Sequence, residues 1–360
     1  VQTCALPILL TSYEDVFKNI CASETSFNKS ESLWEIPFAN AVRGQVLCRT
    51  GLHMDAEALG HLKHTYQDPN NVDAHSGRNS KIQVTPMLVY MYEEADERKF
   101  VTFSPWRWSY GTNSKTKKVN VLYNKAEKIG AYSLAKYRYE WLTYDVQSNE
   151  DGVNMPVMRY SDILLMFAEA SLGVYNVTVN SDDTYNITHG TAPDFSEHTD
   201  YQYTYTGAQC FNAVRDRAKA SSKTLDMQAI MDERALEFCG EHIRKYDLMR
   251  WGIFGPTLRT AQKRIKYFTS YDDAESSAEY AGKLPEKIYY QYTTVNDDQL
   301  SSSDTVQVMT KIYGLTLGEN GVQTCPSVPG DGDWISGDLF NASVPDLYGC
   351  PAEVLEYRQY

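Results

Sequence analysis

The aromatic segment PWRWSYG offers the clearest chemistry in the chain. Trp106, Trp108 and Tyr110 alternate along it, and an extended strand places alternate side chains on one face. Flat aromatic rings stack on the apolar C–H face of a sugar, so this row predicts a platform for carbohydrate. Arg107 and Asn113 would supply hydrogen bonds to sugar hydroxyls. The alternative is a strand whose aromatic side chains face the core.

Trp334 is a second candidate for ligand stacking, because it lies in the polar stretch GDGDWISGD. Trp34, Trp141 and Tyr144 are weaker candidates, for which packing in the core is the simpler interpretation. The chain contains 27 Tyr, which combine an apolar ring with a hydroxyl and suit contact with polar ligands such as sugars. Most of these tyrosines are nevertheless expected to line packing seams between helices.

Metal binding is the other chemistry for which suitable residue types occur. His61 and His64 are three positions apart, which on a helix places two imidazoles on one face. Asp331, Asp333 and Asp338 offer carboxylates for calcium but lack the twelve-residue loop pattern. A solvated surface explains both groups more simply, so we expect no metal ion and no cofactor.

Enzyme signatures of the G-x-S-x-G, Walker, dinucleotide-binding or H-E-x-x-H type do not occur in the sequence. The carboxylate pair of a glycosidase can come from distant positions, so a carbohydrate-active hydrolase on a helical scaffold is the alternative function. The net charge is −13 and no run of Lys or Arg stands out, which argues against nucleic acid as a partner. The sequence contains no stretch of 18 apolar residues, so it predicts no transmembrane helix.

Helical periodicity is strongest in the middle of the chain. Apolar residues recur at helical spacing over residues 160–172, 211–220 and 227–249, and Trp251 with Gly252 then ends the last of these helices. A further helix is expected from Ser12, and residues 32–38 and 99–125 look extended. From residue 268 onward the chain looks rich in loops. Amphipathic helices of this length predict helix hairpins that stack on one another.

Charged residues recur between the apolar positions of these helices, and they suggest either acid–base chemistry or structural pairing. Pairing across adjacent helices is the favoured interpretation, because it fixes helix register. The residues concerned are Arg159, Asp162, Glu169, Glu233, Arg234, Glu237, Arg244, Asp247, Arg250 and the neighbouring Trp251.

Three segments, in this order, resemble motifs of the SusD/RagB family: NMPVMRYSDILLMFAEA at 154–170, FNAVRDRA at 211–218 and IMDERALEFCGEHIRKYDLMRWG at 230–252. Weaker similarities lie at 31–38, 92–102 and 347–356. The sequence departs from the family pattern where Ala235 replaces an arginine and where Gly240 precedes Glu241. Residues 154–252 therefore form the core of the resemblance.

The resemblance implies a mainly α protein, a TPR-like helix-hairpin bundle of SusD type with long irregular loops and a few short strands. It also implies a protein that binds nutrients without catalysis at the surface of the outer membrane. Such a protein delivers oligosaccharide, or in some members peptide, to a SusC-like TonB-dependent transporter. Its contact with the membrane is an N-terminal lipid.

The ends of the chain carry separate expectations. Residues 1–8, VQTCALPI, match the translation of a common sequencing-adapter sequence, so we expect them to be an artefact. Residues 9–360 are then expected to be a SusD/RagB-like domain without the family's signal peptide, lipid-anchor cysteine and N-terminal helices. Cys325 and Cys350 are candidates for a disulfide in an oxidising compartment, with weak support from their spacing.

Overall fold

The fold was analysed on a computed structural model. It describes residues 8–24, 30–40, 42, 44, 46–65, 82–146, 151–193, 205–296, 300–301, 304–317 and 334–340. Several expectations fall outside these residues: the nature of residues 1–7, the Cys325–Cys350 pair, the carboxylates of Asp331 and Asp333, and the similarity at 347–356.

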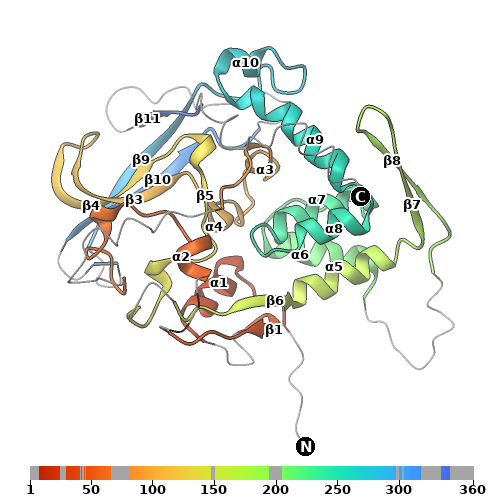
Figure 1. The fold of residues 1–360 in the computed structure, drawn as a ribbon, viewed down its shortest axis with the longest axis horizontal. Coiled ribbons are helices and arrows are strands. Elements are labelled where there is room, and N and C mark those ends of the chain that lie inside the picture. Colours follow the sequence, from red (N-terminus) through yellow and green to blue (C-terminus); the bar gives the residue numbers. More distant parts are fainter. Residues whose placement is uncertain are drawn as a thin grey trace, which may run out of the picture.

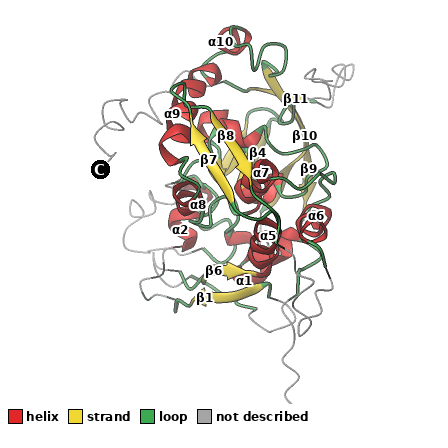
Figure 2. Ribbon diagram, turned by 90° about the vertical axis from the view of Figure 1, so that its right-hand side faces the viewer, coloured by secondary structure: helices red, strands yellow, loops and turns green. Residues whose placement is uncertain are grey.

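The largest sheet and the helices α5 to α8 occupy opposite sides of the molecule. Figure 1 shows the strands β3, β4, β9, β10 and β11 on one side and α5 to α8 on the other. Figure 2 shows the β7–β8 hairpin in front of the helices, with β1 and β6 below them. The helices are α1 (Tyr13–Cys21), α2 (Val46–Thr50), α3 (Pro86–Val89), α4 (Lys99–Thr102), α5 (Tyr160–Ala170), α6 (Gly207–Arg217), α7 (Met227–Glu237), α8 (Arg244–Arg250), α9 (Phe254–Ile265) and α10 (Tyr271–Glu275). The strands are β1 (Ser32–Ile36), β2 (Phe103–Ser104), β3 (Trp106–Asn113), β4 (Lys118–Ala126), β5 (Ser133–Leu134), β6 (Met155–Arg159), β7 (Tyr175–Val179), β8 (Tyr185–His189), β9 (Lys287–Val295), β10 (Thr305–Tyr313) and β11 (Ile335–Asp338).

The main sheet has five strands in the order β11-β9-β10-β4-β3. Its pairs are antiparallel except β10 with β4, which run parallel over three residues. The prediction of a mainly α-helical bundle with a few short strands is therefore wrong, and the fold is mixed α and β. The physical reason is the C-terminal part, where KIYYQYTTV and TVQVMTKIY form long strands in a region expected to be loops.

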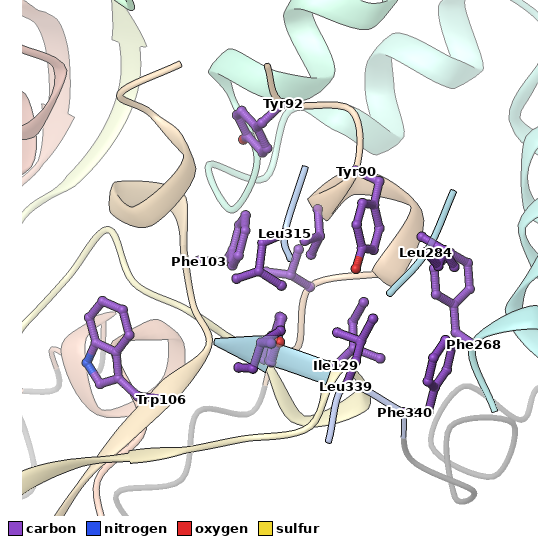
Figure 3. Packing of buried hydrophobic residues seen from close by; sticks show 14 of the residues in the cluster. Tyr90, Tyr92, Phe103, Trp106, Ile129, Phe268, Leu284, Leu315, Leu339 and Phe340 are labelled. Atoms are coloured by element: carbon purple, nitrogen blue, oxygen red, sulfur yellow. The ribbon is translucent and has the colours of Figure 1, made fainter. Parts of the chain in front are cut away.

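The hydrophobic interior joins the sheet to the helices. Val89 of α3, Ile265 of α9 and Ile288 and Tyr290 of β9 are buried in one cluster, part of which is seen in Figure 3. A separate cluster holds α5 to α8 together and includes the buried Trp251. Leu236 of α7 is buried in the first cluster as well. The main sheet and the helices α5 to α8, which we call the helical half, are thus parts of one packed structure.

The expected helices form, with one break. Ser12 caps α1, since its side chain accepts a hydrogen bond from the Asp15 backbone N–H, as the capping pattern predicts. Residues 227–249, expected as one helix, form α7 and α8 with a turn between them. Gly240 lies in that turn with a φ of 80°, a left-handed conformation that glycine adopts without strain. The break turns α8 so that its charges meet those of α5 and α7.

Among the described helices none is both long and apolar enough to cross a membrane.

Candidate functional site

Ionic side chains fill the space between the helical half and the rest of the molecule. We call this set the central ion cluster, and its members are Glu31, Asp96, Arg98, Lys136, Arg159, Arg215, Arg217, Glu233, Glu237 and Glu241. Each is at most 5% exposed. Five of these residues are basic and five are acidic, so the buried formal charge sums to zero. Balance of this kind is a condition for burying charge at tolerable cost.

Arg159 lies at the centre of the central ion cluster. Its guanidinium contacts Glu31 at 2.6 Å, Glu241 at 2.7 Å and Glu237 at 3.1 Å. Arg217 contacts Glu237 as well, at 2.5 Å, so these contacts join the residue before β1 to β6, α6 and α7. Burial alone would raise the pKa of Glu237, but the surrounding arginines outweigh burial and hold that pKa well below its usual range. The carboxylate is therefore ionised and fully engaged, which leaves it no proton to exchange with a substrate.

The remaining motif charges pair between α5, α7 and α8. Arg234 contacts Asp162 at 2.7 Å and Asp247 at 2.8 Å, and Arg250 contacts Glu169. The indole N–H of Trp251 donates to Glu169 as well. Arg244 instead donates to the Met231 carbonyl, 2.8 Å away. These contacts are the cross-helix pairing that the sequence suggested, and they leave little capacity for ligand.

The expected platform on β3 is not an exposed row of rings. Trp106 is 9% exposed and Trp108 is 3% exposed, and they lie in two different hydrophobic clusters. Arg107 is held by Asp55 and Glu127, and the buried Asn113 donates to Gln307 at 3.1 Å. The alternative of a strand with aromatic side chains facing the core fits this placement. The physical reason is that core side chains cover both rings: Trp106 packs in the cluster of Phe103, and Trp108 packs in the cluster of Met54 and Phe17.

Tyr110 and the two histidines pack against neighbouring residues. The ring of Tyr110 stacks on that of His61, with centroids 3.3 Å apart. The Nδ1 atom of His61 lies 2.9 Å from Asp304, and that of His64 lies 2.8 Å from Asp145. The two imidazoles therefore contact different carboxylates, and within the described ranges no group of three potential ligands gathers for a metal ion.

Trp334 belongs to a partly exposed aromatic cluster on the main sheet. It directly precedes β11, and its ring lies 5.1 Å from that of Tyr313 at the end of β10. Tyr313 is in register with Tyr289 of β9, so their side chains share one face of the sheet. We call Tyr289, Tyr313 and Trp334 the sheet aromatic cluster, and all three side chains are only partly buried.

Polar groups surround the sheet aromatic cluster. Thr310 and Gln291 are paired across β10 and β9, and Ser336 of β11 lies opposite Tyr289. Lys115, in the turn between β3 and β4, donates to the Ser336 carbonyl at 3.2 Å. Partly exposed rings flanked by hydroxyl, amide and ammonium groups can stack on a sugar and hydrogen-bond its hydroxyls.

Sequence reasoning gave Trp334 as a candidate for stacking and did not include its neighbours Tyr289 and Tyr313. The signal was present, because Ile288, Tyr290 and Tyr292 alternate with Tyr289 and Gln291 and so predict a strand with two different faces. In the central ion cluster, the similarities at 31–38 and 92–102 include Glu31 and Arg98 but did not predict that they pair with Arg159 and Glu237, more than 100 positions away.

The described chain is a mixed α/β protein whose helix motifs meet in buried ion pairs. A family model described as the SusD family matches residues 30–313. A match over most of the chain identifies its family: the chain belongs to the SusD family, as the three motifs indicated.

Individual relatives are more distant. "SusD-like protein P25" of Formosa agariphila is 26% identical over 274 residues, which cover 71% of this chain and 45% of that protein. The crystal structure of a SusD homolog from Bacteroides thetaiotaomicron is 23% identical with a TM-score of 0.48, covering 72% of this chain and 48% of the other. A laminarin-binding SusD-like protein is 20% identical with a TM-score of 0.44, covering 70% and 48%. The chain thus spans about half the length of these relatives.

Proposed function

We propose that this chain binds oligosaccharide without converting it, as part of a nutrient-uptake system at the surface of the outer membrane. In this proposal a lipid holds the protein to the membrane, and a SusC-like TonB-dependent transporter receives the cargo. The observation that carries the proposal is the family match across residues 30–313, because SusD/RagB resemblance implies this role.

The sheet aromatic cluster is the proposed contact surface for the sugar. Its rings are accessible from solvent, whereas Trp106 and Trp108 are buried and serve the fold. Stacking on a shallow surface with a few hydrogen bonds gives weak binding, on the order of micromolar to millimolar. Tyr110 keeps partial exposure beside His61 and is a secondary contact in this proposal.

A carbohydrate-active hydrolase is the alternative function, and the state of the buried carboxylates favours binding over hydrolysis. Glu233, Glu237 and Glu241 each contact basic side chains within the protein. A glycosidase needs one carboxyl group that is protonated and one that is free, both facing the sugar. Carboxylates locked in ion pairs do not meet that requirement.

Replacement of Trp334 by Ala tests the proposed surface. We expect Trp334→Ala to weaken oligosaccharide binding about fivefold, since one stacking contact is worth about 1 kcal/mol. Binding is measured by calorimetry, after a screen of the purified protein against neutral and anionic hexasaccharides. Release of reducing ends is assayed in the same mixtures, and none is expected.

Trp34→Ala is the matched control, because Trp34 is 62% exposed on β1, outside the main sheet. It should leave affinity unchanged. Saturable binding that Trp34→Ala removes and Trp334→Ala does not would refute the proposed surface. Turnover that disappears when a single Asp or Glu is replaced would establish the hydrolase instead.

A further inference from the structure

Positive charge is concentrated beside the sheet aromatic cluster in an otherwise acidic protein. The whole chain carries 47 acidic and 34 basic residues. Residues 99–126 contain six Lys or Arg and not one Asp or Glu. Apart from Lys99 in α4, all of these basic residues lie in β3, β4 or the turn that connects them. The local excess of positive charge is therefore a property of the hairpin and not of the surface in general.

Three lysines in or next to this turn pair with no carboxylate of the described residues. Lys115, Lys117 and Lys118 are exposed, and among the described residues no Asp or Glu lies within ion-pair distance of them. Lys115 donates to the Ser336 carbonyl and Lys118 to the Thr294 hydroxyl, 2.9 Å away. An ammonium group has three donors, so each keeps capacity for a further acceptor and a charge that neutral partners do not offset. By contrast, Arg107 and Lys125 of the same hairpin approach Asp55.

The turn that carries these lysines is anchored. Asn113 is 1% exposed, donates to Gln307 and accepts a hydrogen bond from the Lys115 backbone N–H at 3.0 Å. Thr116 donates to the same Gln307 oxygen. A fixed turn displays its charges without the entropy cost of ordering them when a ligand binds. Asn113, expected from sequence to touch the ligand, thus positions the residues next to it.

Lys115 lies close to the aromatic rings. Ser336, whose carbonyl accepts a hydrogen bond from Lys115, is opposite Tyr289 and two residues after Trp334. Lys118 instead donates to Thr294, whose side chain lies on the other face of β9 from Tyr289. From these observations we infer that the sheet aromatic cluster and Lys115 form one site for anionic oligosaccharides, whose sugars carry carboxylate or sulfate groups. The inference rests on the proposed function and specifies its ligand class. Trp334 and Tyr313 stack on the sugar rings, while Lys115 binds an anionic substituent.

The test compares anionic with neutral hexasaccharides on the same protein. Hexagalacturonate and a chondroitin sulfate hexasaccharide are the anionic probes, and maltohexaose and laminarihexaose are the neutral ones. The wild-type protein should bind at least one anionic probe about tenfold more tightly than either neutral probe at low salt. About 0.5 M NaCl should remove most of that difference, because exposed charges are screened over a few ångströms at such ionic strength.

Lys115→Gln should lose about tenfold in affinity for the anionic probe and keep its affinity for neutral ones. Lys115→Arg should retain binding, and Lys245→Gln, at an exposed lysine of the helical half, is the matched control with equal change of charge. Equal binding of neutral and anionic probes, or full anionic binding by Lys115→Gln, would overturn the inference while leaving carbohydrate binding intact. Tighter binding of hexaglutamate than of any glycan would overturn the ligand class, and no binding of any glycan would overturn the proposed function as well.

Discussion

Arg159→Met is expected to lower the free energy of unfolding by about 3–5 kcal/mol. The side chain is 1% exposed and contacts Glu31, Glu237 and Glu241. Its removal leaves buried carboxylates without their shared cation, and water cannot replace it at that depth. Chemical denaturation of the variant and the wild type, followed by circular dichroism, measures the difference.

Arg264→Met is the control for Arg159→Met. Arg264 pairs with Glu279 at 2.8 Å, but both side chains are more than 40% exposed. An exposed pair of this kind contributes at most about 1 kcal/mol. Arg159→Lys should fall between the two, because it keeps the charge and loses the planar fork. If Arg159→Met unfolds at the same denaturant concentration as Arg264→Met, the central ion cluster does not stabilise the fold.

Acid is expected to destabilise the protein steeply between about pH 4.5 and pH 2. Arginines and lysines that surround Glu237 and Glu241 outweigh burial and lower the pKa of each carboxyl below its usual range. Burial also raises the pKa of Glu93, but hydrogen bonds from Ser221 and Arg215 outweigh burial and lower that pKa to about 2. In this window the unfolded chain binds protons that the folded chain does not, so stability is present above the ordinary glutamate pKa and is lost as pH falls.

Each such buried carboxylate adds about 1.4 kcal/mol per pH unit to the slope. Glu140 opposes the trend, because burial raises its pKa, but the glutamates with lowered pKa outnumber it. Unfolding free energies measured at intervals from pH 7 to pH 3 should therefore fall below pH 5, and Glu237→Gln should make the slope shallower. A flat profile from pH 5 to pH 3 would contradict the ionised state assigned to the central ion cluster.

Local periodicity predicts the helical half of the fold well and the sheet poorly. Residues 160–172 and 211–220 became α5 and α6, two consecutive helices whose apolar stripes pack in one cluster. The strands β9 and β10 pair with each other, and β10 also pairs with β4, more than 180 positions away. Strand pairing at that separation leaves no pattern in either segment alone. The alternation in residues 287–295 was readable, but its long-range partner was not.

The candidate site, like the fold, was predicted only in part from local sequence. Trp334 was predicted from its polar surroundings, and it remains accessible. The alternation of Trp106 and Trp108 predicted a strand correctly, but alternation does not say which side of a strand faces solvent. Lys115 could not be recognised as a candidate from sequence, because its contact with Ser336 joins positions more than 200 residues apart.

The indole N–H signal of Trp334 tests the central claim most directly. The chain has six Trp, so ¹⁵N-labelled protein gives few indole signals, and Trp334→Phe assigns the one that matters. During titration with the hexasaccharide that binds most tightly in calorimetry, the Trp334 signal should move and saturate with the calorimetric affinity, while those of Trp34 and Trp108 stay in place. A Trp334 signal that does not move at saturating ligand, above all if the Trp34 signal does, would contradict binding at the main sheet.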